Sequence, residues 1–330
     1  MFELNWELLL KRTISLHSSS SKLITRSLAT NIYSKDTRFV FELIQNAEDN
    51  EYKRALAANE AVYIKFSVYP EKVIVDSNED GFTEANVRAI CSAGQSTKTF
   101  TQGYIGEKGI GFKSVFKIAS RVHIQSGPFS FSFEHQHGQN GLGIITPENQ
   151  EHEELPEDVY TRITLRLTDP TKFEQRVADL LELPDTLLLF LKRLVRITIC
   201  IHRPNQPLSE IAYSYHEDKG NPIVKLIKVS GPAGDHQETT SLYHIARRQL
   251  SNLPTDGTQK RTDKAEVVLA FPVNGNSVPV IQPQHVFAYL PLRKVGFSVC
   301  YAIVGSKYKP LTRSSFSSSP TFSLKPAERM

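Results

Sequence analysis

The stretch Gly103-Tyr-Ile-Gly-Glu-Lys-Gly-Ile-Gly-Phe-Lys-Ser114 is the most informative part of the chain. Gly106, Gly109 and Gly111 form a GxxGxG run directly before an apolar pattern that starts at Phe112 and predicts a helix. Glycines at this spacing let the backbone adopt positive φ values and approach a ligand closely. A helix that begins there points free N–H groups at an anion, most naturally a phosphate. Glycine runs also cap helices and form turns, so this run alone leaves both possibilities open.

A second motif, Arg38-Phe-Val-Phe-Glu-Leu-Ile-Gln-Asn-Ala-Glu-Asp-Asn-Glu-Tyr52, lies upstream. Its apolar residues recur at helical spacing, which predicts an amphipathic helix. Glu42, Asn46 and Asp49 lie four and three residues apart and so share one side of that helix. An Asn oxygen suits Mg²⁺, and a Glu one turn away can orient or deprotonate a water molecule. A solvated helix face would show the same spacing, although Asn is a poor helix former and Asn46 invites a further reason.

A third motif, Lys72-Val-Ile-Val-Asp-Ser-Asn-Glu-Asp-Gly-Phe82, lies between the other two. Its β-branched run predicts a short strand, and Asp76 begins a stretch rich in turn residues. An Asp at a strand end can accept a hydrogen bond from an exocyclic amine such as that of adenine. The alternative is an Asx-type turn residue, and the local sequence allows both.

Together, the order and spacing of these motifs resemble the GHKL ATPase superfamily, which includes ninety-kilodalton heat-shock chaperones, DNA gyrase B subunits, MutL and histidine kinases. The segment 42–49 resembles the N-box, 76–81 the first glycine box, 105–112 the second, and 160–167 the late strand of that superfamily. Three further segments are similar to the sacsin/Nov-type ATPase domains of large eukaryotic proteins, namely Asn78–Phe82, Cys91–Lys98 and Gly103–Phe116. The resemblance implies an α/β fold, specifically an α+β two-layer sandwich of the Bergerat type, followed by a smaller α/β domain.

The resemblance also implies a role for each matching residue around the base and the metal ion. Glu42 would activate the attacking water, and Asn46 would be the Mg²⁺ ligand. Asp76 would bond the adenine amine, with Thr161 assisting through water. Asp49 would support that pocket from the N-box helix.

Further residues are implied around the phosphates, as part of a lid over roughly residues 92–105. Gly81 would let the base lie against the backbone. The expected phosphate contacts are Ser96, Thr97, Lys98, Gly106, Gly109, Ile110, Gly111 and Phe112. Lys108 and Lys113 could neutralise phosphate or lie at the surface, where lysine is normally found.

The first glycine box departs from the common family pattern. Many members have glycines two and four residues past the aspartate, where this chain has Asn78 and Asp80, with its glycine at Gly81. The Nov-type branch shares this arrangement, so the departure favours that branch.

Composition limits the function classes. The 330 residues suit about two domains, and we expect an ATP-binding domain over residues 1–203, with its core at about 20–170, and a partial second domain over 204–304. A net charge of +4 gives no sign of nucleic-acid binding. Cys91, Cys200 and Cys300 are odd in number and widely spaced, which favours a reducing, intracellular compartment. We expect neither a secretory signal nor a membrane span.

The residue pattern in the second half of the chain predicts mostly strands, over 196–202, 224–229, 265–271, 286–290 and 297–303, with a helix at about Leu242–Leu250. A core helix is expected to end at 187–194. Residues 305–330 are rich in Ser and Pro and predict a disordered tail. His135 and His137 lack nearby partners and give little indication of a metal site. A fragment, a shortened paralogue or an imperfect gene model would each produce such an ending.

The predicted function is that of an ATP-binding, Mg²⁺-dependent ATPase of chaperone-like type, in which Glu42 activates water. One alternative is a nucleotide-gated protein-interaction module with little or no hydrolysis. Another is a structural remnant that binds no nucleotide. The partners implied are ATP or ADP, with protein clients or a second copy of the chain, and neither nucleic acid nor membrane.

Overall fold

The computed structural model describes residues 38–92, 112–134, 147–232, 235–250, 265–280, 284–288, 290–295 and 300–304. These residues belong to one compact unit that spans Lys35–Lys307. Most of the predicted phosphate contacts lie outside the described residues, namely Ser96, Thr97, Lys98, Gly106, Gly109, Ile110 and Gly111. The same holds for Lys108, for the two histidines at 135 and 137, and for the predicted tail.

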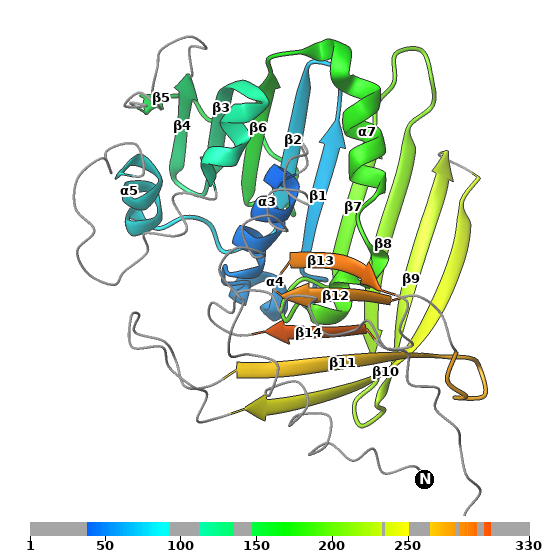
Figure 1. Cartoon of the computed structure of the whole chain (residues 1–330). Helices are drawn as coiled ribbons and strands as arrows, with labels where there is room; N and C mark the ends of the chain where they lie inside the picture. Colours follow the sequence, from blue (N-terminus) through cyan, green and yellow to red (C-terminus); the bar gives the residue numbers. More distant parts are fainter. Residues whose placement is uncertain are drawn as a thin grey trace, which may run out of the picture. The chain divides into compact units, whose positions relative to one another are not determined.

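The described part of the chain forms one 14-stranded sheet in the order β13-β12-β14-β11-β10-β9-β8-β7-β1-β2-β6-β3-β4-β5 (Figure 1). The strands are β1 (Tyr63–Val68), β2 (Lys72–Ser77), β3 (Ala119–Ser126), β4 (Phe129–Glu134), β5 (Glu148–Asn149), β6 (Thr161–Leu167), β7 (Arg196–Ile201), β8 (Ser209–Glu217), β9 (Ile223–Pro232), β10 (Gln237–Leu250), β11 (Ala265–Val273), β12 (Gln284–Ala288), β13 (Leu290–Val295) and β14 (Cys300–Val304). The sheet is mixed, because β1 pairs with β7 and β12 with β14 in parallel, while the other neighbours are antiparallel.

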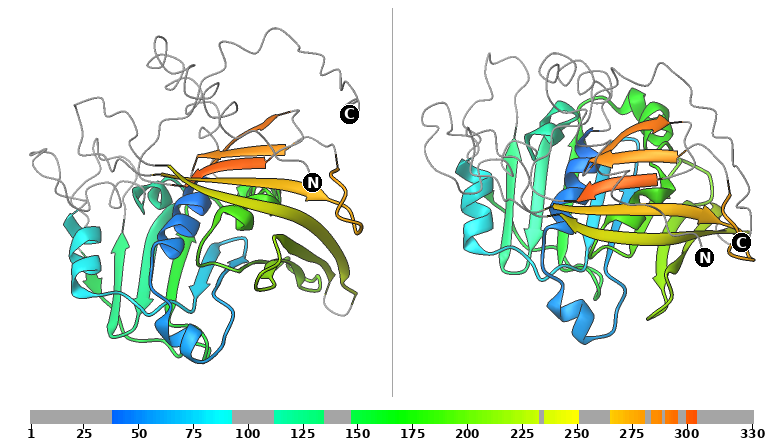
Figure 2. Two further views of the ribbon diagram at one scale, coloured as in Figure 1. Left: turned by 90° about the horizontal axis from the view of Figure 1, so that it is seen from below. Right: turned by 60° about the horizontal axis from the view of Figure 1, so that its bottom comes forward.

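Helices are few and short among the described residues. The α-helices are α3 (Arg38–Glu48), α4 (Lys53–Ala57), α5 (Glu84–Ser92) and α7 (Phe173–Leu181), and the 3₁₀ helices are η1 (Lys113–Lys117), η2 (Pro170–Lys172) and η3 (Asp185–Phe190). The two views of Figure 2, compared with Figure 1, show α3 and α7 on the same side of the central strands. Within the described ranges, no helix is long and apolar enough to cross a membrane.

Helix α3 confirms the helix predicted from the second motif. Its apolar side chains point into the core, and Phe39, Val40, Leu43, Ile44 and Ala47 are each 5% exposed or less. These positions recur at intervals of three and four residues, so one stripe of the helix is buried against the sheet while the polar stripe faces elsewhere.

Strand β2 shows how the sheet divides its side chains between two faces. Because side chains alternate along a strand, Val73, Val75 and Ser77 share one face, and Asp76 points to the other. Its ladder partner on β6 is Arg162, and the guanidinium makes a bidentate ion pair with Asp76, with Nε–Oδ1 at 2.7 Å and Nη2–Oδ2 at 2.8 Å. This alternation decides below which residues can reach the candidate site.

One element after β9 differs from the sequence-based expectation. Residues 242–250, expected to be helical, lie instead in strand β10, which pairs with β9 over residues 237–244 and with β11 over 242–250. Strand β11 pairs with the whole of this stretch and β9 with its first three residues, and Tyr243 is buried on one face, so tertiary pairing overrides the local pattern. The described residues of 204–304 contain strands and no helix.

The chain is therefore an α/β protein with a large mixed sheet and few helices. The strands predicted over 196–202, 224–229 and 265–271 are present as β7, β9 and β11. The apolar segment before β7 forms the 3₁₀ helix η3 rather than the end of an α-helix. The finer assignment to a two-layer sandwich is not confirmed.

Candidate functional site

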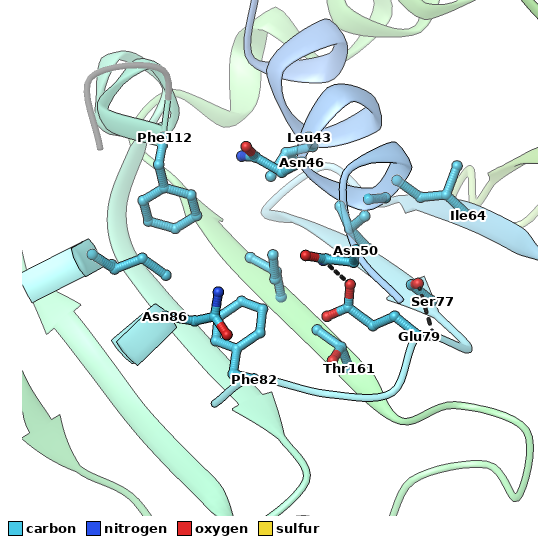
Figure 3. A pocket seen from close by; sticks show the side chains of 14 residues that line it. Leu43, Asn46, Asn50, Ile64, Ser77, Glu79, Phe82, Asn86, Phe112 and Thr161 are labelled. Atoms are coloured by element: carbon cyan, nitrogen blue, oxygen red, sulfur yellow. Dashed lines mark hydrogen bonds between the residues drawn. The ribbon is translucent and has the colours of Figure 1, made fainter. Parts of the chain in front are cut away.

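A cavity of about 800 Å³, including its open mouth, lies between α3 and the sheet (Figure 3). Eight of its lining residues are apolar: Leu43, Ala47, Ile64, Val75, Phe82, Ile90, Phe112 and Ile163. The other six are polar: Asn46, Asn50, Ser77, Glu79, Asn86 and Thr161. A mostly apolar cavity with a few converging polar groups is typical of a small-molecule site.

Helix α3 and the turn that follows it form one wall of the cavity. Leu43, Asn46, Ala47 and Asn50 line it at intervals of three and four residues, so the same side of the helix faces inward over two turns. Asn46, the predicted metal ligand, is therefore placed in the cavity. Glu42 is half-buried one turn before Asn46, outside the lining, and Asp49 is exposed and outside it as well.

Strands β2 and β6 form the floor. Val75 and Ser77 come from β2, and Thr161 and Ile163 from the paired strand β6, so all four lie on one face. Thr161 lines the cavity, and its hydroxyl is 2.5 Å from Ser126 Oγ.

Asp76 does not reach the cavity, and this corrects the adenine-binding role given to it above. It belongs to the opposite face of β2, where it is 5% exposed and bound by Arg162. The sequence could have indicated this, because side chains alternate along a strand and Asp76 is one residue out of step with the apolar residues Val73 and Val75.

The acidic group in the cavity is Glu79, which the sequence analysis did not single out. It is the one carboxylate among the lining residues and is 2% exposed. Asn50 Nδ2 donates a hydrogen bond to Glu79 Oε2, and the backbone N–H of Glu79 donates to Ser77 Oγ at 3.2 Å (Figure 3). Its Oε1 has no hydrogen-bond partner among the described residues. Burial is the main cause that raises the pKa of Glu79 to about 7.

The two residues beside Glu79 explain the departure in the first glycine box. Asn78 Oδ1 accepts from the Tyr63 N–H at 3.0 Å, and its Nδ2 donates to the Ala61 carbonyl at 2.9 Å. Asp80 accepts the N–H groups of Lys53 and Arg54, at 2.8 and 2.9 Å, at the start of α4. Both side chains fix the loop on either side of Glu79, so its carboxyl group enters the cavity.

Gly81 serves a different contact from the one expected. Its φ is +90°, and a Cβ added there would lie 2.7 Å from Tyr160 Cε1. Gly81 does not line the cavity, so the close approach it permits is to the Tyr160 ring rather than to a bound base.

The site has no preformed metal cluster within the described ranges. No group of three or more His, Cys, Asp or Glu side chains in the described part of the chain could hold a metal ion. Asn46 offers a single side-chain oxygen, which fits an ion that takes its other ligands from phosphates and water.

The fold and the cavity define an α/β protein with a buried acidic group in a mostly apolar pocket between a helix and a sheet. No protein-family model matches the chain. The chain is 42% identical over 120 residues to Protein NO VEIN of Arabidopsis thaliana, which covers 36% of this chain and 4% of that protein. It is 23% identical over 227 residues to the Chaperone protein HtpG of Shouchella clausii (strain KSM-K16), which covers 61% of this chain and 36% of the chaperone. These similarities support a distant HSP90-like link.

Proposed function

We propose that the chain binds ATP with Mg²⁺ in the cavity between α3 and the sheet, as a chaperone-like ATPase module of the sacsin/Nov type within the Bergerat-type α/β sandwich family. The observation that carries the proposal is the unpartnered Oε1 of Glu79. A buried acceptor without a partner costs about 1–3 kcal/mol, and the exocyclic amine of adenine would satisfy it. The similarity to a chaperone supports the same class.

The rest of the lining suits a planar base. Val75, Ile163 and Phe82 offer apolar lining. Figure 3 shows Phe82 and Thr161 at the same end of the cavity as Glu79. Such a site holds the base by apolar contact and orients it by a few polar groups.

The phosphates would extend from the base toward Asn46 and Phe112. Mg²⁺ would neutralise phosphate charge when bound, with Asn46 as its protein ligand. Phe112 directly follows the glycine run, whose predicted phosphate contacts remain proposals. Glu42, one turn from Asn46 on α3, is proposed to orient the attacking water.

Calorimetric titration of the full chain with ATP, with and without Mg²⁺, tests binding. We expect saturable binding that Glu79→Ala weakens about tenfold or more, because a hydrogen bond to a charged group contributes about 1.5–3 kcal/mol. The matched control is Asp76→Asn, a carboxylate on the opposite face of β2, which should bind as the parent does. A well-folded parent that does not bind ATP would overturn the proposal.

Turnover is tested separately, because Glu42 is half-buried outside the cavity lining. If Glu42 activates water, Glu42→Ala should hydrolyse ATP about 10²–10⁴-fold more slowly than the parent. Stoichiometric ATP binding without turnover that depends on Glu42 would instead favour the nucleotide-gated protein-interaction module.

A further inference from the structure

The carboxyl group of Glu79 has two unequal oxygens. Oε2 accepts a hydrogen bond from Asn50 Nδ2, whereas Oε1 has no partner among the described residues. Because an amide N–H can only donate, Oε2 is committed to the acceptor role. A proton on this carboxyl group therefore resides on Oε1.

Among the described residues, no cation lines the cavity to hold Glu79 ionised. The described lining contains no Lys, Arg or His. From β6 the nearby Thr161 hydroxyl, whose own hydrogen bond is to Ser126 Oγ at 2.5 Å and not to Oε1, lowers the pKa of Glu79. From the loop itself, Asp80 raises it by charge repulsion. From the turn after α3, the Asn50 amide also lowers the pKa, although burial outweighs both.

Three other parts of the described chain place neutral groups near Glu79. Tyr52, which precedes α4, is buried, and this burial is the main cause that raises the pKa of its hydroxyl, which therefore stays protonated. Ser77 at the end of β2 accepts the Glu79 backbone N–H, and Asn86 of α5 lines the cavity. The guanidinium groups of Arg162 and Arg193 are engaged with other partners: Arg162 with Asp76, and Arg193 with the Asn50 carbonyl and Glu51.

We propose that Glu79 carries a proton on Oε1 in the ligand-free cavity and releases it to solvent when a nucleotide binds, with Asn50 as the positioning residue that leaves Oε1 as the site of exchange. The inference rests on the proposed function. An O–H on Oε1 would face the amine N–H of the incoming base, so two donors would oppose each other. When the O–H bond breaks, its electron pair stays on Oε1, and that oxygen becomes an acceptor for the amine.

The consequence is a nucleotide affinity that increases with pH around neutrality. If binding requires the ionised carboxyl group and the pKa is about 7, the binding-competent fraction rises about tenfold between about pH 6 and pH 8. Binding at about pH 6 should release about 0.9 proton, and binding at about pH 8 about 0.1 proton.

Calorimetry in pairs of buffers with different ionisation enthalpies measures the released protons directly. The first probe is adenosine, which has no phosphate group that titrates in this range, and the second is MgATP. Glu79→Gln has nearly the same shape without a group that titrates, and we expect it to show neither proton release nor pH-dependent affinity for adenosine. Glu71→Gln, at an exposed position, is the matched control and should behave as the parent does.

Asn50→Leu tests the positioning role. Without the amide donor, the ionised carboxylate loses a hydrogen bond that lowers the pKa of Glu79, so the midpoint of the pH dependence should move upward. A purely structural role for Asn50 would weaken binding at all pH values and leave the midpoint unchanged, which would overturn the assignment of Asn50.

The outcomes separate this inference from the proposed function. Adenosine or MgATP binding by the parent without proton release, or release that persists in Glu79→Gln, overturns the inference and leaves nucleotide binding intact. A folded parent that binds neither probe overturns the proposed function itself. Proton release by the parent that falls from about pH 6 to pH 8 supports the inference.

Discussion

Replacing Glu79 by Gln should stabilise the ligand-free protein at alkaline pH and leave its stability in acid nearly unchanged. The pKa of Glu79 is raised from 4.5 to about 7, mainly because burial disfavours the charged form. The folded state therefore binds this proton more tightly than the unfolded state does. The stability contributed by the neutral carboxyl group is fully present below about pH 4.5 and is lost as pH rises through about 7.

The magnitude follows from the size of the shift. A displacement from 4.5 to about 7 corresponds to at most about 3–4 kcal/mol, at about 1.4 kcal/mol per pKa unit. Glutamine stays neutral at every pH, so the difference in unfolding free energy between the Gln variant and the parent should grow by up to about 3 kcal/mol between about pH 4.5 and pH 8.

Thermal melts of the full chain without nucleotide, at about pH 5 and pH 8, measure this difference. We expect the Gln variant to gain about 5 °C relative to the parent on going from the lower to the higher pH. Comparing the two proteins at each pH cancels the titration of all other groups, and Glu71→Gln serves as the exposed control. A Tm difference that is the same at both pH values would refute the claim that Glu79 is a buried acid with a raised pKa.

Two further predictions concern residues next to the cavity. Gly81→Ala should destabilise the fold by about 1–3 kcal/mol, because alanine is strained at a φ of +90°. The added Cβ would also meet the Tyr160 ring at 2.7 Å and displace it, which increases the loss. Denaturant titration measures this loss, and a stability equal to the parent's would contradict it. Asp76→Asn should lower the unfolding free energy by about 1–3 kcal/mol, because Arg162 loses its bidentate partner, while calorimetry finds unchanged ATP affinity. A large loss of affinity with unchanged stability would return Asp76 to the binding site.

Local pattern was sufficient for the elements that build the cavity. The spacing of apolar residues over 38–52 predicted α3, and the β-branched run at 72–75 predicted β2, because both periods are set by backbone geometry within the element itself. The position of Asn46 followed, since residues at i, i+3 and i+4 share a helix face.

Pattern failed where a side chain's role depends on strand pairing. Asp76 was expected to bind a base from its place at the strand end, yet the pairing of β2 with β6 places it opposite Arg162 on the other face. Residues 242–250 were expected to be helical, yet they form the middle of three paired strands. In both cases the deciding partner lies more than ten residues away in sequence.

The apolar stripe of α3, the central strands and the motifs that indicate a nucleotide can all be read from local sequence, because propensity and periodicity act over a few neighbouring residues. Which carboxylate enters the cavity depends instead on contacts between elements that lie far apart in the sequence. Glu79 does so because Asn78 and Asp80 fix its loop to β1 and α4, and because Asn50 reaches it from the turn after α3. Burial among these elements, more than the charge of the neighbouring Asp80, raises the pKa of Glu79 to about 7 and leaves Oε1 without a partner among the described residues.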